Sequence, residues 1–130
     1  MTAETKIRRH VMRLAAAALF LAWTHPPAFA HAELRRATPA AGGTVEAAPA
    51  EIVLNFSERL EIAFSSVVVR DALGRRVDKQ DSHVDPADRT TMRVSVPNLT
   101  KGTYIVVWRA LTTDTHRTEG AFAFQIGEPQ

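Results

Sequence analysis

The feature that most constrains the fold is a regular alternation of apolar and polar residues over short runs. Ile52, Leu54 and Phe56 fall on one side of the chain if their segment is extended. The same two-residue period recurs in residues 91–96 and in residues 120–126. A helix cannot place such a pattern on one face, because its period is about 3.6 residues. The chain is therefore predicted to consist of strands that each pack one face on a core.

Turn-forming residues separate these runs. Residues 66–71 form another apolar run, followed by a predicted turn into residues 76–78, and residues 104–111 are apolar on both faces, which predicts a central strand. Tyr104 follows the Gly102 turn, as in the tyrosine corner of immunoglobulin-like sandwiches. Glycine and proline mark further boundaries at residues 39–43, 48–49, 85–86 and 97–102. About seven short strands in this spacing predict an all-β fold, a small Greek-key β-barrel or sandwich.

The first thirty residues have the three parts of a secretory signal. Basic side chains at positions 6, 8, 9 and 13 precede an apolar run at residues 14–23, and the segment ends in Ala28-Phe29-Ala30. A transmembrane helix needs about 20 apolar residues, and Pro26-Pro27 ends this run well short of that length. We predict that residues 1–30 are a signal peptide cleaved after Ala30, and that residues 31–130 form one soluble domain outside the cytoplasm.

The charge of the precursor misleads about partners until this cleavage is taken into account. The 130 residues carry 16 basic and 14 acidic side chains, a formal charge of +2. The predicted signal removes four basic residues and one acidic residue, which leaves 12 basic and 13 acidic side chains and a formal charge of −1. This balance argues against nucleic acid as a partner. The absence of cysteine excludes disulfides, zinc-thiolate sites and thiol nucleophiles.

Cleavage after Ala30 makes His31 the first residue of the mature chain. Its free amine and its imidazole Nδ1 can then close a chelate ring on one metal ion. The two groups have reference pKa values of about 8 and about 6.5, so a metal ion can displace their protons near neutral pH. The sequence therefore predicts two nitrogen donors on His31, and these need further ligands from elsewhere in the chain.

Asp114-Thr115-His116, a D-x-H motif, follows the predicted central strand. Residues two apart in an extended chain project to the same side, so we expect Asp114 and His116 to offer an oxygen and a nitrogen together. Taken alone, such a motif is more commonly a turn or a hydrogen-bonded pair. Together with His31 it makes three nitrogens and one oxygen, a set that suits Cu(II) best. Zinc prefers a tetrahedral arrangement, and the sequence alone does not define the angles.

Several segments together resemble one protein family. They are His31-Ala-Glu-Leu34, Thr38-Pro-Ala-Ala-Gly42, Ala48-Pro49, Leu54-Asn-Phe-Ser-Glu58 and Gly102–Gly120, the last containing the pattern W-R-A-x-x-x-D-T-H-x-x-x-G. Over essentially the whole mature chain, the sequence resembles the CopC (PcoC-like) periplasmic copper-resistance proteins. The resemblance implies a Greek-key β-barrel of the cupredoxin or immunoglobulin-like sort. It also implies a Cu(II) site formed by His31, Asp114 and His116.

The methionine content departs from part of that family. Some members carry a methionine-rich loop for Cu(I), an ion that prefers soft thioether ligands. After the predicted cleavage, Met92 is the one methionine left, and residues 71–88 carry charged residues where such a loop would place methionine. The sequence therefore predicts one Cu(II) per chain and no second, Cu(I) site.

Two further residues are candidates for the metal site. Glu58 follows a predicted strand and matches a glutamate of the resembling family, so it either orients an imidazole of the site or is a surface charge at a strand end. His83 lies in a polar stretch, where a solvated loop is favoured over an additional or bridging ligand. Trp108 is expected in the core, since indole offers no lone pair to a metal.

These observations predict a monomeric periplasmic copper carrier, which serves copper sequestration, resistance or delivery and is not an enzyme. Its expected partners are the copper ion and an inner-membrane copper transporter or another periplasmic copper protein. Two alternatives stay open. One is a copper oxygenase that uses the same histidine pair as a brace, against which the anionic Asp114 argues. The other is a metal-free immunoglobulin-like interaction module, in which His31 and the D-x-H motif never meet.

Overall fold

The alternating segments form eight strands in the computed structural model, which describes residues 32–128. A single turn of 3-10 helix, η1, covers Ile62–Phe64. The strands are β1 (Leu34–Thr38), β2 (Thr44–Val45), β3 (Glu51–Phe56), β4 (Ser66–Asp71), β5 (His83–Val84), β6 (Thr91–Ser95), β7 (Gly102–Leu111) and β8 (Arg117–Ile126). Within residues 32–128, no helix has the length and apolar character needed to cross a membrane.

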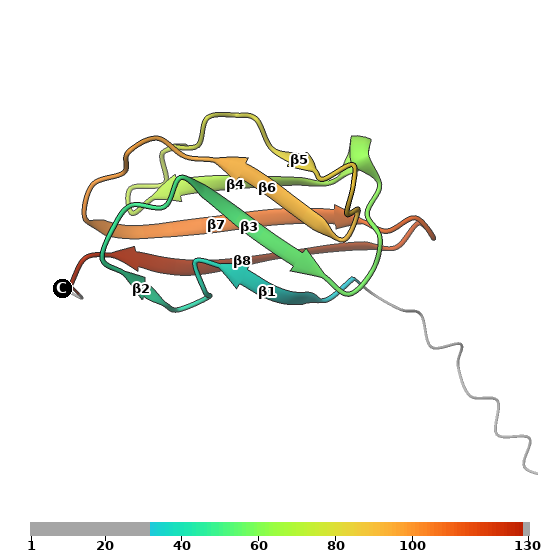
Figure 1. Ribbon diagram of the computed structural model, residues 1–130, viewed down its shortest axis with the longest axis horizontal. Helices are drawn as coiled ribbons and strands as arrows, with labels where there is room; N and C mark the ends of the chain where they lie inside the picture. Colours follow the sequence, from blue (N-terminus) through green and yellow to red (C-terminus); the bar gives the residue numbers. More distant parts are fainter. Residues whose placement is uncertain (1–31, 129–130) are drawn as a thin grey trace, which may run out of the picture.

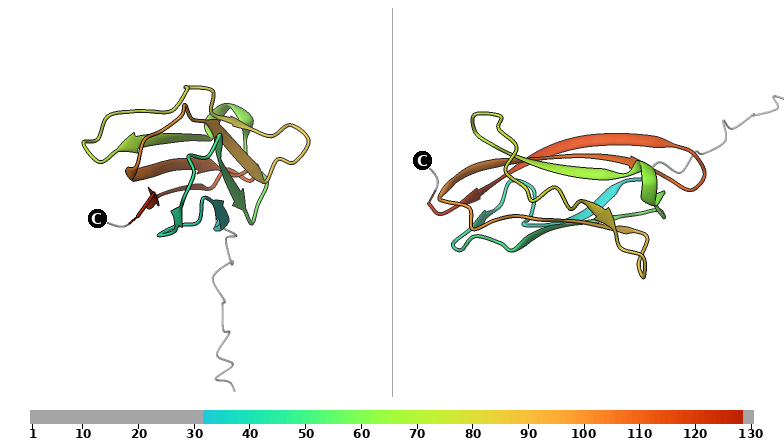
Figure 2. Two further views of the ribbon diagram at one scale, coloured as in Figure 1. Left: turned by 60° about the vertical axis from the view of Figure 1, so that its left-hand side comes forward. Right: turned by 90° about the horizontal axis from the view of Figure 1, so that it is seen from above.

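The strands make two four-stranded sheets that face each other as two layers (Figures 1 and 2). One sheet has the order β1-β3-β6-β5 and the other the order β2-β8-β7-β4. All pairs are antiparallel except the short β2–β8 pair. The all-β sandwich is confirmed, and β7 lies between two neighbours, as a central strand should. The eight strands include two edge strands of two residues each, β2 and β5.

The core lies between the two sheets and is formed by the predicted inward faces. Ile52, Leu54 and Phe56 of β3 are buried, as are the apolar residues of β6 and its end, Met92, Val94 and Val96. On β8 the prediction holds for Phe124 and Ile126, whereas Phe122 is only partly buried. The strand period therefore assigned the core face correctly over most of both sheets.

Tyr104 and Trp108 join the core from β7. The Tyr104 hydroxyl donates a hydrogen bond of 2.6 Å to the carbonyl of Thr100, which confirms the tyrosine corner. Trp108 is 8% exposed and packs edge-on against Phe56 with ring centroids 5.0 Å apart. It thus belongs to the core, as expected, and it links β7 of one sheet to β3 of the other.

Gly120 allows Trp108 to lie close to β8. The two residues are cross-strand partners, and a Cβ at position 120 would lie 2.5 Å from Cζ2 of Trp108. Gly120→Ala should therefore lower the free energy of unfolding by about 1–3 kcal/mol, the usual cost of overpacking. Urea unfolding followed by tryptophan fluorescence measures this. The control is Glu119→Ala at the exposed neighbour, expected within about 0.5 kcal/mol of the parent; equal stability of Gly120→Ala and the parent would contradict the contact.

Residues 76–78, which follow the predicted turn, do not form a strand. Arg76 makes only an isolated bridge with Arg70. The reason is the buried carboxylate of Asp78, whose Oδ2 accepts the backbone N–H of Val69 on β4 at 2.8 Å. A side chain thus takes a donor that a neighbouring strand would otherwise pair. Oδ1 also accepts the N–H of Gln80 at 2.8 Å, and Arg76 contacts both oxygens at 3.0–3.1 Å.

Asp78 should make the stability of the fold sensitive to acid. Burial alone would raise its pKa, but the Arg76 side chain and the N–H groups of Val69 and Gln80 outweigh burial and lower it. An unfolded aspartate has a pKa near 3.9. The stabilisation is therefore present above about pH 4 and is lost as the pH falls through the folded pKa.

The variant Asp78→Asn tests this dependence. It should lower the free energy of unfolding at pH 7 by about 1–3 kcal/mol, because charge-assisted hydrogen bonds are lost. It should also lose less stability than the parent between about pH 4 and pH 3, since the titrating group is gone. Urea titrations at pH 7 and at about pH 4 and pH 3 measure the two effects, with Glu46→Gln at an exposed carboxylate as the control. If the free energy of unfolding falls equally in parent and variant over this pH range, Asp78 is not the source of the acid sensitivity.

Candidate metal site

The D-x-H motif lies at the tip of the hairpin formed by β7 and β8. The strand register pairs Trp108 with Gly120 and Leu111 with Arg117, so the hairpin is centred on Asp114. Beyond the last paired residues, the N–H of Thr112 donates to the carbonyl of His116 at 2.9 Å. The long strands therefore carry the motif to one end of the sandwich, at the right in Figure 1.

The loop conformation differs from the extended chain expected from the sequence. The N–H of Thr115 donates to the carbonyl of Thr112 at 2.9 Å, which closes a turn, and Thr115 has a φ of 72°. A three-residue hairpin loop commonly ends in such a left-handed residue. The expectation of an extended D-x-H is therefore wrong, because residues 113–115 must reverse the chain. For a β-branched threonine this φ is strained.

The turn nevertheless brings the two candidate ligands together. Nδ1 of His116 lies 3.1 Å from Oδ1 of Asp114. The same carboxylate oxygen accepts a short hydrogen bond from the hydroxyl of Thr112. The side chain of Asp114 is 57% exposed and that of His116 is 27% exposed. An oxygen and a nitrogen thus lie side by side at the hairpin tip, where the carboxylate side chain is exposed and Nδ1 of His116 is itself buried.

Asp114 is held in the form that can bind a cation. The hydrogen bond from Thr112 and then the one from His116 lower the pKa of its carboxyl group, against a smaller opposing effect of desolvation. The group is therefore a carboxylate at neutral pH. An ionised oxygen next to an imidazole is a donor pair suited to a divalent transition metal.

Two other segments meet the hairpin at this end of the sandwich. The buried Ala32, where the described chain begins, accepts a hydrogen bond of 3.1 Å through its carbonyl from the hydroxyl of Thr118 on β8. The segment after β3 contacts the loop of the β7–β8 hairpin, where the N–H of Thr113 donates to the carbonyl of Arg59 at 3.1 Å. The N-terminal segment and the β3–η1 connection are thus both attached close to the D-x-H motif.

Comparison with known sequences identifies the family. A family model described as the CopC domain matches residues 34–127. The chain belongs to the CopC family. Protein YobA of Escherichia coli (strain K12) is 33% identical over 116 residues, covering 88% of this chain and 94% of that protein. Copper resistance protein C of Pseudomonas syringae pv. tomato is 37% identical over 103 residues, covering 75% of this chain and 81% of that protein.

Solved structures of the CopC family share the fold. CopC from Methylosinus trichosporium OB3b has a TM-score of 0.67 and 30% sequence identity, covering 77% of this chain and 99% of that one. PcoC, described as a methionine-rich copper resistance protein from Escherichia coli, has a TM-score of 0.63 and 36% sequence identity. The match covers 75% of this chain and 99% of that one. Both the family and the β-sandwich predicted from the sequence are thereby confirmed.

The remaining predicted site residues of this CopC-family chain lie in different places. His31 falls outside the described residues. Glu58 lies in the β3–η1 connection, between Ser57, which bonds Glu33, and Arg59, which bonds the hairpin loop. His83 is exposed on β5 in the opposite sheet, with Nδ1 2.9 Å from the carbonyl of Asp81. Within residues 32–128 no three histidine, aspartate or glutamate side chains form a group that could hold a metal ion.

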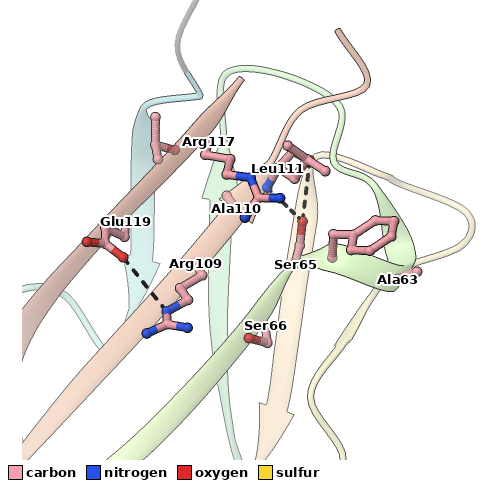
Figure 3. A pocket seen from close by; sticks show the side chains of 10 residues that line it. Ala63, Ser65, Ser66, Arg109, Ala110, Leu111, Arg117 and Glu119 are labelled. Atoms are coloured by element: carbon pink, nitrogen blue, oxygen red, sulfur yellow. Dashed lines mark hydrogen bonds and ion pairs between the residues drawn. The ribbon is translucent and has the colours of Figure 1, made fainter. Parts of the chain in front are cut away.

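A shallow pocket lies beside the hairpin loop, on the β2-β8-β7-β4 sheet (Figure 3). Its volume is about 600 Å³. Nε of Arg109 and Oε2 of Glu119 form an exposed ion pair of 3.7 Å at its wall. The D-x-H pair is not among the lining residues, which include Phe64, Ser66, Leu111, Arg117 and Thr118. The pocket and the candidate metal site are therefore separate features.

Two contributors to the site were missed at the sequence level. Thr112 contacts both members of the D-x-H motif, and a threonine two residues before an aspartate is a usable signal, since hydroxyl side chains often bond nearby groups in turns. Gly120 is the last residue of the W-R-A-x-x-x-D-T-H-x-x-x-G pattern. A glycine is required there because Trp108 packs against it and leaves no room for a Cβ. The equal spacing of Trp108 and Gly120 from Asp114 indicates a hairpin centred on that residue.

Proposed function

We propose that the chain, processed to begin at His31, is a periplasmic copper carrier that binds one Cu(II) through His31, Asp114 and His116. The observation that carries this proposal is the 3.1 Å approach of Asp114 Oδ1 and His116 Nδ1 at the hairpin tip, where the Asp114 side chain is exposed. Membership of a family with copper resistance and copper transport proteins supports copper as the metal. The carrier sequesters copper or passes it on, and it catalyses no reaction.

The anchoring of Ala32 supports the participation of His31. The Ala32 carbonyl is bonded to Thr118, two residues beyond His116. Consecutive Cα atoms are about 3.8 Å apart, so a histidine joined to Ala32 starts close to the hairpin. The amine and imidazole of His31, added to the imidazole of His116 and the carboxylate of Asp114, complete three nitrogens and one oxygen. This donor set favours tetragonal Cu(II) over tetrahedral zinc.

Met92 supports a site for the oxidised ion. It is the one methionine of residues 31–130, and its side chain is fully buried in the core on β6. Cu(I) prefers thioether and thiolate ligands, whereas the proposed site offers nitrogen and oxygen. The proposal therefore includes one Cu(II) per chain and no separate Cu(I) site.

The position of Glu58 supports a role next to the metal ligands. Its segment is bonded to the N-terminal segment through Ser57 and to the hairpin loop through Arg59. A carboxylate there is suited to orient an imidazole of the site by accepting its second N–H group. His83, exposed on the opposite sheet, is not included among the proposed ligands.

A copper transporter is the proposed partner. Copper transport protein CutJ of Bacillus subtilis (strain 168) is 31% identical over 111 residues, which are 85% of this chain and 20% of that protein. A CopC-like part within a longer copper transport protein supports the proposal that the present chain, working as a monomer, exchanges copper with an inner-membrane transporter or with another periplasmic copper protein.

A fluorescence titration tests the proposed function. Trp108 is the one tryptophan of residues 31–130, and it lies on the strand that leads to the hairpin loop. Adding Cu(II) to the mature chain should quench its emission and saturate at one equivalent. His83→Ala should behave as the parent does. Quenching that needs several equivalents, or that is lost with His83→Ala, would contradict the proposed site.

Export can be tested independently. Secreted from a bacterial host, the chain should be recovered from the periplasm with His31 as its first residue, because small residues at Ala28 and Ala30 direct cleavage after Ala30. Amino-terminal sequencing of the recovered protein identifies this residue. Any other first residue would remove the amine donor from the proposed site.

A further inference from the structure

We propose that Thr112 is a positioning residue of the copper site, whose one hydroxyl group orients Asp114 and His116 together. The inference rests on the proposed function, since it concerns the same site. Thr112 is 1% exposed and lies immediately beyond β7, at the base of the hairpin loop. Its backbone also forms an isolated bridge with the fully buried Leu60. The hydroxyl therefore projects from a fixed part of the fold.

The hydroxyl contacts both proposed ligands with different atoms. Its oxygen accepts the backbone N–H of His116 at 3.0 Å, and its proton is donated to Oδ1 of Asp114. A hydroxyl has one proton and two lone pairs, so it can serve both contacts at once. The carbonyl of His116, at 3.3 Å, competes for the same proton, but a bond to a charged carboxylate is the stronger one.

The main chain of Thr112 supports the same arrangement. Its N–H donates to the carbonyl of His116 at 2.9 Å, and its carbonyl accepts the N–H of Thr115 at 2.9 Å. These two bonds close the loop and would persist with any side chain at position 112. The side chain adds what they lack, a direct link between the carboxylate of Asp114 and the backbone of His116.

This link matters for a metal that requires defined angles. Cu(II) prefers a square-planar or tetragonal set of donors, and ligands held in place before binding lose less conformational freedom on binding. Without the hydroxyl, the 57% exposed Asp114 side chain loses its link to the buried Thr112 and keeps its contact with the side chain of His116. Loss of a group that orients a metal ligand typically weakens metal binding 10- to 100-fold.

The test compares Thr112→Val, Thr112→Ser and Thr113→Val in the mature chain. Valine keeps the shape and removes the hydroxyl, serine keeps the hydroxyl, and Thr113 is an exposed neighbour in the same loop. Cu(II) affinity, measured against a competing chelator, should fall about 10- to 100-fold for Thr112→Val. Thr112→Ser and Thr113→Val should bind as the parent does. The Cu(II) electron paramagnetic resonance parameters should change only in Thr112→Val, which a merely destabilised fold would not produce.

A metal-free measurement separates this proposal from the proposed function. Three-bond scalar couplings report the rotamer of the Asp114 side chain by nuclear magnetic resonance. They should show one rotamer in the parent and in Thr112→Ser, and averaging in Thr112→Val. Unchanged couplings in Thr112→Val would overturn the role of Thr112, whatever the copper result. If the parent itself fails to bind Cu(II), the proposed function fails, and the couplings alone decide whether Thr112 orients Asp114.

Discussion

Adding one glycine before His31 of the mature chain should weaken Cu(II) binding by at least about 100-fold, the upper end of what losing an outer-shell partner costs a metal site. The extension leaves the imidazole in place but turns the α-amine into an amide, which is no longer a basic nitrogen donor. The chelate ring of amine and imidazole is therefore lost. Competition with a chelator of known affinity, at fixed pH, measures the change.

The matched control adds one glycine after Gln130. It changes the length of the chain by the same amount but leaves the amine of His31 free, so its Cu(II) affinity should equal that of the parent. If the N-terminal extension also binds as the parent does, His31 contributes no amine to the metal. The D-x-H pair would then have to bind copper with different ligands.

His116→Ala should have a comparably large effect. The change removes one of the three proposed nitrogen donors and also the partner 3.1 Å from Asp114 Oδ1. We expect affinity to fall by at least about 100-fold, since a ligand should contribute no less than the groups that orient it. Titration followed by Trp108 fluorescence should no longer saturate at one equivalent.

The controls for His116→Ala address the fold and the histidine count. His116 lies in the loop between β7 and β8, outside both sheets, so its removal should leave the β-sandwich intact, which circular dichroism can verify. His83→Ala removes the other described histidine, exposed on β5, and should leave binding unchanged. Retention of tight binding by His116→Ala would show that the D-x-H motif does not hold the metal.

The strand faces could be predicted because burial follows a simple period. Ile52, Leu54 and Phe56 alternate with polar residues, and all three are in the core. Asp78 could not be predicted in the same way. Its carboxylate bonds a backbone donor of Val69, nine residues earlier, and no local pattern indicates such a contact. This side-chain interaction holds Asp78 against β4.

The candidate site was predicted in part, and for an incorrect structural reason. An extended chain was expected to place Asp114 and His116 on one side. The two residues do meet, but through a hairpin turn with a left-handed Thr115. The hydroxyl of Thr112 contacts both residues, and these contacts form only when the loop closes into the turn. His31 lies outside residues 32–128, so its place in the site stays a prediction.

Pulsed electron paramagnetic resonance of the Cu(II)-loaded mature chain tests the central claim most directly. With 15N-labelled histidine, the remote imidazole nitrogens count the histidines bound to copper. We predict two equatorial histidines in the parent, and one in His116→Ala under conditions that still load the metal. Coupling to a single histidine, or to none, in the parent would contradict a copper site formed by His31, Asp114 and His116.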